Sequence, residues 1–460
     1  MLLAVALGAA LGAALGGCDS PACSLEDVGT RAGCDEGYVC AEVSGGEPTC
    51  LAQVVVRGHV FDALDGAAIA GATVVAIDAD GAARSTSVRT AIDGSYEIPV
   101  IAVRDTEGVP IAEPITLRSD AAGYQTFPTA PRTALPIDLS TAVAEEAGSG
   151  YVVEGVVTEI ALIPLPPGAG TATISGSIAH ADAGGALVVA ALGAASVSSA
   201  IADKDGAFVL FNVPAGDVVL DGYRSGLNVE EQTASVAAGA VIDGVVLSAS
   251  RDGLASLSGS VNIVNGGACR STSVVLVVES TFRENVARGE VPAGLRVGDV
   301  SGAFTIEDVP PGRYVVLAAF ENDECVRDPD PCIAGTDIVH VDVPSQTDLS
   351  ESFKVTGALA VESPGADHME SISDAQPTFR WEDDSSEQGY ELRVYDAFGE
   401  LVHEDLDVPS VSGGDVSYVW SDASMMPGMV YQFRVWSWRR AERCLISSTE
   451  DLEGVFVYEP

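Results

Sequence analysis

Nine cysteines carry most of the chemistry that this sequence offers. Four of them, Cys23, Cys34, Cys40 and Cys50, lie in a short segment punctuated by glycines. Such a segment is too small for a hydrophobic core, so covalent staples are expected in its place. Zinc is the competing interpretation, but the segment has no CxxC pair and no histidine. The spacing therefore predicts disulfides in an oxidising compartment, and it leaves open which of three pairings forms.

Cys18 follows an apolar stretch at the N-terminus. Residues 2–15 are all Leu, Ala, Val or Gly, a run shorter than the about 20 residues that cross a bilayer and typical of a signal peptide. The next residues, Leu15-Gly16-Gly17-Cys18, resemble the lipobox of bacterial lipoproteins, although no Lys or Arg precedes the run. The resemblance implies a signal peptide of residues 1–17, a lipid on Cys18 and a membrane anchor. An ordinary signal peptide with a coincidental cysteine is the alternative.

Two further cysteines, Cys325 and Cys332, flank a loop that contains two prolines. The prolines stiffen the loop, so we expect a disulfide between these two residues, worth about 2.5 kcal/mol in the chain-entropy model. A pair of free thiols is the alternative, and it suits an oxidising compartment poorly. Elimination leaves Cys269 and Cys444 as a possible disulfide between distant parts of the chain.

No catalytic or cofactor-binding pattern is present. The sequence has no HExxH or HxxE motif, no GxSxG elbow and no Gly-rich phosphate loop. Carboxylate pairs such as Glu145-Glu146 and Asp383-Asp384 are typical of solvated turns. Asp78-Ala79-Asp80-Gly81 and Asp203-Lys204-Asp205-Gly206 resemble half of a calcium loop, but the Glu at the twelfth position is missing, which favours turns. We therefore expect a protein that is not an enzyme and holds no cofactor or metal.

The composition restricts the class of partner and of fold. The chain has 67 acidic and 23 basic residues and a net charge of -44, which excludes sequence-independent nucleic-acid binding. The acids are scattered through turns, which favours solubility over a cation-binding surface. The 49 Gly, 23 Pro and few aromatics indicate short strands joined by turns. A chain of 460 residues also needs several cores, so the expected class is all-β with tandem small antiparallel β-sandwiches.

Residues 54–140 follow the Cys-rich segment of residues 18–51 and show the alternation of half-buried strands, with a hairpin turn at Asp93-Gly94. They resemble the carboxypeptidase regulatory-like domain, a small transthyretin-like sandwich. Four segments carry the resemblance: RGHVFD (57–62), IAGATV (69–74), TAIDGSY (90–96) and AGY (122–124). In zinc carboxypeptidases such a domain accompanies a peptidase domain, but the histidines of this chain do not form the metal set that a peptidase needs.

Parts of this pattern recur at 172–250 and 255–354. Each copy has a turn with Gly, a small residue and an aromatic, then a strand and a Val-Pro-x-Gly turn. The two copies read DGAF (205–208) with VPAG (213–216), and SGAF (301–304) with VPPG (309–312). The repeats predict three tandem sandwiches.

Residues 356–460 hold all four tryptophans. Trp381 is expected to point inward, and the segment from Met426 to Tyr431 resembles the turn before strand F of a fibronectin type III domain, where a Tyr bonds back to the backbone. On the following strand, Arg434, Trp436 and Trp438 alternate with the expected core face. These three residues either form a binding surface for a sugar or a partner's side chain, or pack with arginines stacked on the indoles.

Two functional classes remain open. The first is a lipid-anchored structural or adhesive protein of the bacterial cell envelope, facing the periplasm or the cell surface, in which the sandwiches form a stalk. The second is a surface lipoprotein that binds a carbohydrate, a peptide or an envelope protein through its C-terminal domain. Exposed, paired aromatic side chains would favour the second class.

Overall fold

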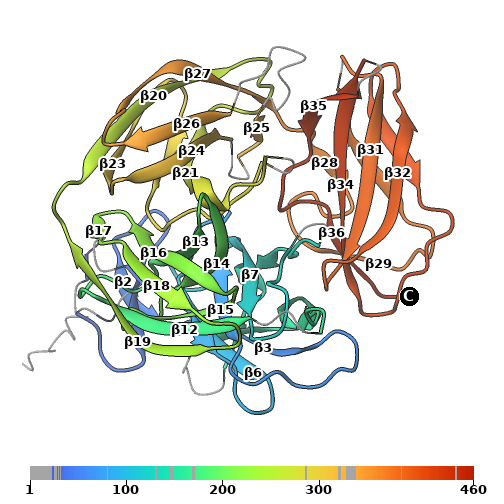
Figure 1. Ribbon diagram of the computed structural model, residues 1–460. Coiled ribbons are helices and arrows are strands. Elements are labelled where there is room, and N and C mark those ends of the chain that lie inside the picture. The colour runs from blue at the N-terminus through green and yellow to red at the C-terminus, as the bar shows by residue number, and fades with distance from the viewer. Residues whose placement is uncertain are drawn as a thin grey trace, which may run out of the picture.

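The computed structural model describes residues 23–24, 28–29, 31, 33–79, 81–129, 132–145, 150–167, 171–284, 287–319, 323–327, 338–384, 386–440 and 443–460. In these ranges the regular elements are strands, with a few single turns of 3-10 helix between them (Figure 1). No described helix has the length and hydropathy to span a bilayer. The predicted all-β class is confirmed: a disulfide-bonded N-terminal hairpin is followed by four β-sandwich domains. The core of the third sandwich continues into buried residues of the first two, among them Val75, Leu187 and Tyr223.

The first sandwich is built around β3 (Val54–Asp62). Val54, Val56 and Val60 of this strand are fully buried, which is the expected alternation of a strand with one face in the core. Its sheet also contains β6 (Ser95–Val100), β9 (Val143–Ala144), β10 (Tyr151–Glu154) and β11 (Ile160–Leu162). The facing sheet contains β4 (Thr73–Ile77), β5 (Val88–Arg89), β7 (Pro114–Asp120) and β8 (Ile137–Asp138). The domain therefore extends past residue 140, because β9, β10 and β11 complete the sheet of β3.

The predicted hairpin turn at Asp93-Gly94 is present. Asp93 Oδ1 accepts hydrogen bonds from the backbone N–H and the hydroxyl of Ser95. Gly94 has a φ of 79°, and a Cβ there would lie 2.6 Å from the Val60 carbonyl oxygen. Only glycine satisfies both the positive φ and the close approach, so this position fixes the register of β6 against β3.

The second sandwich runs from β12 (Ala172–Ala179) to β19 (Val241–Ser250), and its strands form one curled eight-stranded sheet. The intervening strands are β13 (Leu187–Leu192), β14 (Ala195–Ile201), β15 (Ala207–Val213), β16 (Gly216–Arg224), β17 (Leu227–Val229) and β18 (Gln232–Val236). The repeated aromatic Phe208 and Val213, the first residue of the Val-Pro-x-Gly turn, are both buried. The apolar positions of the repeat motif therefore belong to the core.

The third sandwich has two four-stranded sheets. One contains β20 (Ala255–Ile263), β23 (Ala303–Val309), β25 (Cys325–Arg327) and β27 (Asp348–Gly357). The other contains β21 (Thr272–Val278), β22 (Arg296–Val300), β24 (Gly312–Ala318) and β26 (Val339–Val343). Phe304 occupies the position of Phe208 and is also buried. In both domains this phenylalanine lies opposite a glycine of the first strand, Gly176 in the second and Gly259 in the third.

The fourth domain packs a three-stranded sheet on a larger one. The smaller sheet contains β28 (Val361–Ser363), β30 (Thr378–Glu382) and β33 (Asp415–Val419). The larger contains β29 (Glu370–Ile372), β31 (Gly389–Asp396), β32 (Leu401–Pro409), β34 (Val430–Arg439), β35 (Cys444–Ser448) and β36 (Val455–Tyr458). Trp381 is fully buried against Tyr390, as expected, with ring centroids 5.5 Å apart.

One pairing is shared by the first three sandwiches. The first strand of each domain pairs in parallel with its last: β3 with β11, β12 with β19, and β20 with β27. The first and last strands of each domain are thus held side by side, and the chain leaves each sandwich beside the strand by which it entered.

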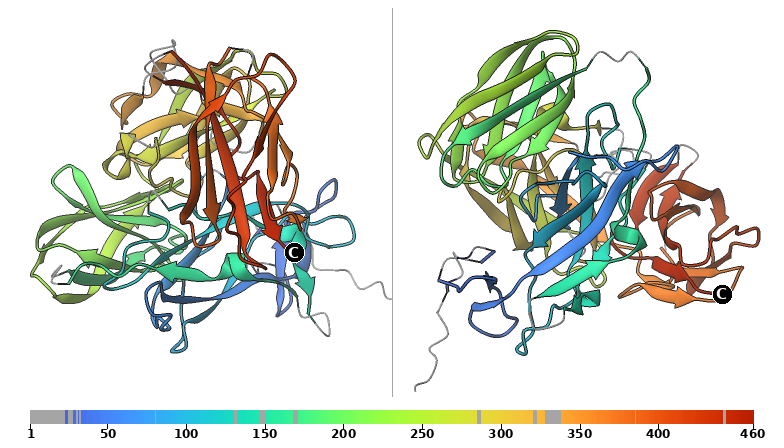
Figure 2. Two further views of the ribbon diagram at one scale, coloured as in Figure 1. Left: turned by 90° about the vertical axis from the view of Figure 1, so that its right-hand side faces the viewer. Right: turned by 90° about the horizontal axis from the view of Figure 1, so that it is seen from below.

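The four sandwiches cluster around a common centre, as the three views together show (Figures 1 and 2). The buried Arg118 of the first sandwich bonds to Glu290 of the third and to Ser199 of the second. The Asn212 side chain of the second sandwich donates to backbone carbonyls of the first. Arg132 of the first donates to the Phe398 carbonyl of the fourth. The first sandwich therefore contacts all three others.

Candidate functional site

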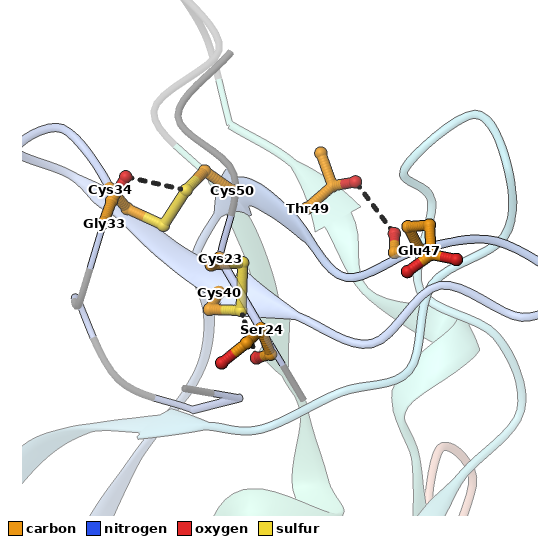
Figure 3. The surroundings of a disulfide bond; sticks show 8 residues. All are labelled: Cys23, Ser24, Gly33, Cys34, Cys40, Glu47, Thr49 and Cys50. Carbon is orange, nitrogen blue, oxygen red and sulfur yellow. Dashed lines mark hydrogen bonds between the residues drawn. A yellow bond between two sulfur atoms is a disulfide. The ribbon is translucent and has the colours of Figure 1, made fainter. Parts of the chain in front are cut away.

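The N-terminal hairpin pairs β1 (Tyr38–Ala41) with β2 (Thr49–Ala52). Its disulfides join Cys23 to Cys40 and Cys34 to Cys50, which settles the pairing that the spacing left open (Figure 3). Cys40 and Cys50 lie opposite each other in the hairpin, so each disulfide attaches one upstream cysteine to one strand. The sulfur atoms of Cys23, Cys34 and Cys50 lie within 4.8 Å of one another, but they are disulfide-bonded and offer no thiolate to zinc.

The hairpin is docked on the first sandwich through Arg104, which is 1% exposed. Arg104 Nη2 donates to the Ala52 carbonyl at 2.7 Å, and the Ser44 N–H donates to the Arg104 carbonyl at 2.8 Å. The guanidinium also lies over the Tyr151 ring, 5.3 Å from its centroid. Cys18 lies outside the described residues, five positions before Cys23. The predicted anchor residue is thus separated by a short segment from a rigid, covalently closed unit.

The predicted disulfide between Cys325 and Cys332 is wrong, because Cys325 is bonded to Cys269. The two Cα atoms are 4.9 Å apart, and both residues are buried in the third sandwich. The same bond excludes the suggested pairing of Cys269 with Cys444. Cys444 is also disulfide-bonded, and Cys332 lies outside the described residues. The prediction failed because it used only the length and the prolines of the local loop, whereas the sandwich brings β25 to the segment that precedes β21.

The face of β34 that carries Trp436 and Trp438 has the predicted alternation: Phe433 and Val435 are fully buried, and both indoles are half-buried. Arginines cover the indoles. Arg393 and Arg434 lie 5.0 and 5.1 Å from the Trp436 ring, and Arg443 lies 4.7 Å from the Trp438 ring. These are cation–π distances, so this geometry agrees with the packing interpretation and not with an open aromatic platform.

Trp438 also packs onto the neighbouring strand. It lies opposite Gly389, where a Cβ would come 2.6 Å from the indole. The glycine provides the space for the ring, so Trp438 is part of the sheet surface. Arg434, the third residue predicted for this face, is mostly buried and forms a salt bridge of 2.5 Å with Asp451. Burial lowers the pKa of Arg434 to about 10, and the guanidinium is still charged at neutral pH.

Tyr431 bonds back to the backbone as the turn motif predicts. Its hydroxyl accepts a hydrogen bond of 2.8 Å from the Met426 N–H. The buried ring stacks on Phe456. This contact fixes the turn that leads into β34, and so it positions the strand that carries Trp436 and Trp438.

The paired carboxylates and the aspartates of the calcium-loop-like sequences have separate structural roles. Glu145 pairs with Arg57, and Asp383 accepts from the Tyr390 hydroxyl. Asp203 Oδ1 accepts from two backbone N–H groups of its own turn, and Asp78 pairs with Arg296. The Asp203 sequence is therefore a turn, and Asp78 Oδ1 likewise accepts from the backbone N–H of Ala82. Among the described residues, the sole cluster of three potential metal ligands is that of the disulfide-bonded cysteines.

Sequence reasoning missed a group of buried acids where the third and fourth sandwiches meet. Glu450 is 5% exposed, and burial, with Asp323 and Glu453 nearby, raises its pKa well above the usual value. Burial also raises the pKa of Glu453 to about 7. Nothing in the local sequence distinguishes these residues from the many exposed acids of the chain, because their burial depends on contacts between two domains.

The raised pKa of Glu453 predicts that the fourth sandwich is less stable at pH 8 than at pH 5. Between the ordinary carboxyl pKa of 4.5 and about 7, the folded state binds more protons than the unfolded state, so the free energy of unfolding falls as pH rises. We expect a loss of about 1–3 kcal/mol. Tryptophan fluorescence in a denaturant titration reports this domain alone, since all four tryptophans belong to it. Glu453→Gln should reduce the dependence and leave the part that comes from Glu450, and equal stability of the parent at both pH values would contradict the prediction.

Comparisons with known proteins add nothing specific about function. No family model and no curated protein matches the chain. Similar solved structures include the Bacillus anthracis TIE protein, at 9% identity and a TM-score of 0.17, covering 85% of this chain and 68% of that one. Another is BcpA, the major pilin subunit of Bacillus cereus, at 10% identity and a TM-score of 0.18, covering 66% of this chain and 100% of that one. A third comprises two B repeat units of the collagen binding protein of Staphylococcus aureus, at 10% identity and a TM-score of 0.16, covering 89% of this chain and 100% of that one. TM-scores this low carry no argument, so the all-β sandwich assignment rests on the strands and sheets of the chain itself.

Proposed function

We propose that the chain is a non-catalytic lipoprotein of the bacterial cell envelope, anchored through a lipid on Cys18, with a structural or adhesive role. The observation that carries the proposal is the disulfide-bonded hairpin, which is fastened to the first sandwich. Its first bonded cysteine, Cys23, lies five positions after Cys18 of the lipobox-like Leu15-Gly16-Gly17-Cys18. A lipid on Cys18 would then hold a rigid body close to the membrane. Disulfides buried in the folded protein also suit an oxidising compartment.

The body held by this anchor is a cluster of sandwiches rather than a linear string. Buried arginines of the first domain bond to each of the other three. This interlocking supports a mechanical role, since the domains are not free to swing independently. The alternative role, binding of a glycan, peptide or envelope protein through Trp436 and Trp438, is less supported, because arginines cover both indoles.

Replacing Cys18 by Ser is expected to release the protein from membranes. The thioether and its acyl chains need the sulfur, and no described helix is long and apolar enough to span a bilayer in their place. In detergent phase separation of the expressed full-length chain, the parent should enter the detergent phase and Cys18→Ser the aqueous phase. Intact mass of the mature N-terminus checks the lipid directly. A Cys34→Ser, Cys50→Ser variant is the control and should remain in the detergent phase. A Cys18→Ser protein that stays with the detergent would overturn the proposal.

A further inference from the structure

The four sandwiches form a partly open cavity at their meeting point, which Arg434 of β34 also lines. Its volume is about 630 Å³, which lies within the range of small-molecule sites. The first sandwich contributes β7 and residues 126, 128, 129 and 132–134. The second contributes β14, the third residues 280–283 and 288–290, and the fourth Arg434, Asp451 and Leu452. All four domains are needed to form it.

The lining of this cavity has the opposite charge to the rest of the protein. Five arginines and three acidic residues line it, in a chain with 67 acids and 23 bases. The arginines are Arg118, Arg132, Arg283, Arg288 and Arg434. The lining thus has more basic than acidic side chains, which is the reverse of the whole chain, although four of the five arginines form ion pairs.

Not all of these arginines are accounted for by contacts between domains. Arg118 and Arg132 are buried and bonded to neighbouring domains, as described above. Arg288 and Arg434 meet the two oxygens of a single carboxylate, that of Asp451. Arg283 is exposed, and its guanidinium has no hydrogen bond or ion pair with any residue that the structure describes. A junction that served only to hold domains together would not require Arg283.

The rest of the polar lining consists largely of hydroxyl groups. Thr116, Thr133, Ser196 and Ser280 line the cavity, and within the described part of the chain their hydroxyls have no hydrogen-bond partner. Hydroxyls both donate and accept, so they match the hydroxyls of a sugar, whereas guanidinium groups match an oxyanion. The lining thus offers two kinds of recognition in one space.

We propose that the cavity binds a sugar that carries an oxyanion, with Arg283 as the main contact to the charge. A carboxylate of a sugar acid and a phosphate of a sugar phosphate share this chemistry. The site does not involve the Cys18 anchor, and it shares only Arg434 with the face of Trp436 and Trp438. Its test is therefore separate from the test of the proposed function.

The test is isothermal titration calorimetry on the full chain with glucuronate, glucose 6-phosphate, glucose and inorganic phosphate. At least one anionic sugar should bind, and at least tenfold more tightly than both glucose and inorganic phosphate. Glucuronate and glucose 6-phosphate then distinguish the two sources of the charge. The proposal would be overturned if neither anionic sugar bound at millimolar concentration. It would also be overturned if inorganic phosphate bound as tightly as the anionic sugars.

Two variants locate the site. Arg283→Gln should weaken the anionic sugar at least tenfold, while Ser280→Ala should weaken it less and equally for charged and neutral sugars. Arg251→Gln is the matched control: this arginine is exposed, pairs with Asp182 and does not line the cavity. The affinity of the Arg251→Gln protein for the anionic sugar should equal that of the parent. Unchanged affinity in Arg283→Gln, with circular dichroism confirming the fold, would place the binding elsewhere and contradict the proposal.

Discussion

Replacing Cys269 and Cys325 together by Ala is expected to lower the free energy of unfolding of the third sandwich by about 4 kcal/mol. The disulfide closes a loop with a sequence separation of 56 residues, and restricting a loop of that length removes much entropy from the unfolded chain. Both side chains are buried. Ala is therefore used instead of Ser, because Ser would leave an unsatisfied hydroxyl in the core.

Differential scanning calorimetry of the full chain measures this loss. The transition that the double variant shifts should be that of the third sandwich, and tryptophan fluorescence should show little change in the fourth. The control is the Cys34→Ala, Cys50→Ala variant, which opens the N-terminal hairpin and should leave the third sandwich unaffected. An unchanged transition in the Cys269, Cys325 variant would contradict the prediction. A non-reducing peptide map joining Cys325 to Cys332 would do the same.

The second large effect is expected from Arg118→Met. Arg118 is 6% exposed; its guanidinium pairs with Asp120 at 3.0 Å and with Glu290 at 2.5 Å, and donates to Ser199. Met keeps much of the volume and removes the charge, so the two carboxylates lose their counter-ion in a buried place. Breaking a buried ion pair in this way costs about 3–5 kcal/mol.

This loss should appear as weaker coupling between the first three sandwiches. In calorimetry their transitions should move to lower temperature and separate. Arg118→Met with Glu290→Gln should recover part of the loss, because one of the unpaired charges is removed. Arg251→Met is the control, since its exposed pair with Asp182 is screened by solvent and contributes little to stability. Equal transition temperatures in Arg118→Met and Arg251→Met would contradict the prediction that Arg118 couples the domains.

Local patterns in the sequence predicted the strands and several contacts. Val54 and Val56 point into a core, Gly94 makes the turn, Trp381 is buried, and Tyr431 bonds back to the backbone. These features depend on alternation and turn chemistry within a few residues, which the sequence displays directly.

Contacts over long distances were not predictable in the same way. The partner of Cys325 depends on how β25 lies beside β27 in the third sandwich, and loop length pointed to the wrong cysteine. The arginines of the cavity are isolated along the chain: Arg118 and Glu290 are 172 positions apart. Their convergence depends on the packing of whole domains, for which a single sequence holds no local signal.

The parallel pairing of first and last strands has a mechanical consequence. If the protein is pulled by its two ends, the force enters a sandwich at the start of its first strand and leaves at the end of its last. In a parallel pair these points lie at opposite ends, so the load runs along the strands. The ladder hydrogen bonds then resist in shear and must break together instead of one after another. The same geometry occurs in β3 with β11, β12 with β19 and β20 with β27, so the first three domains share a design that resists extension.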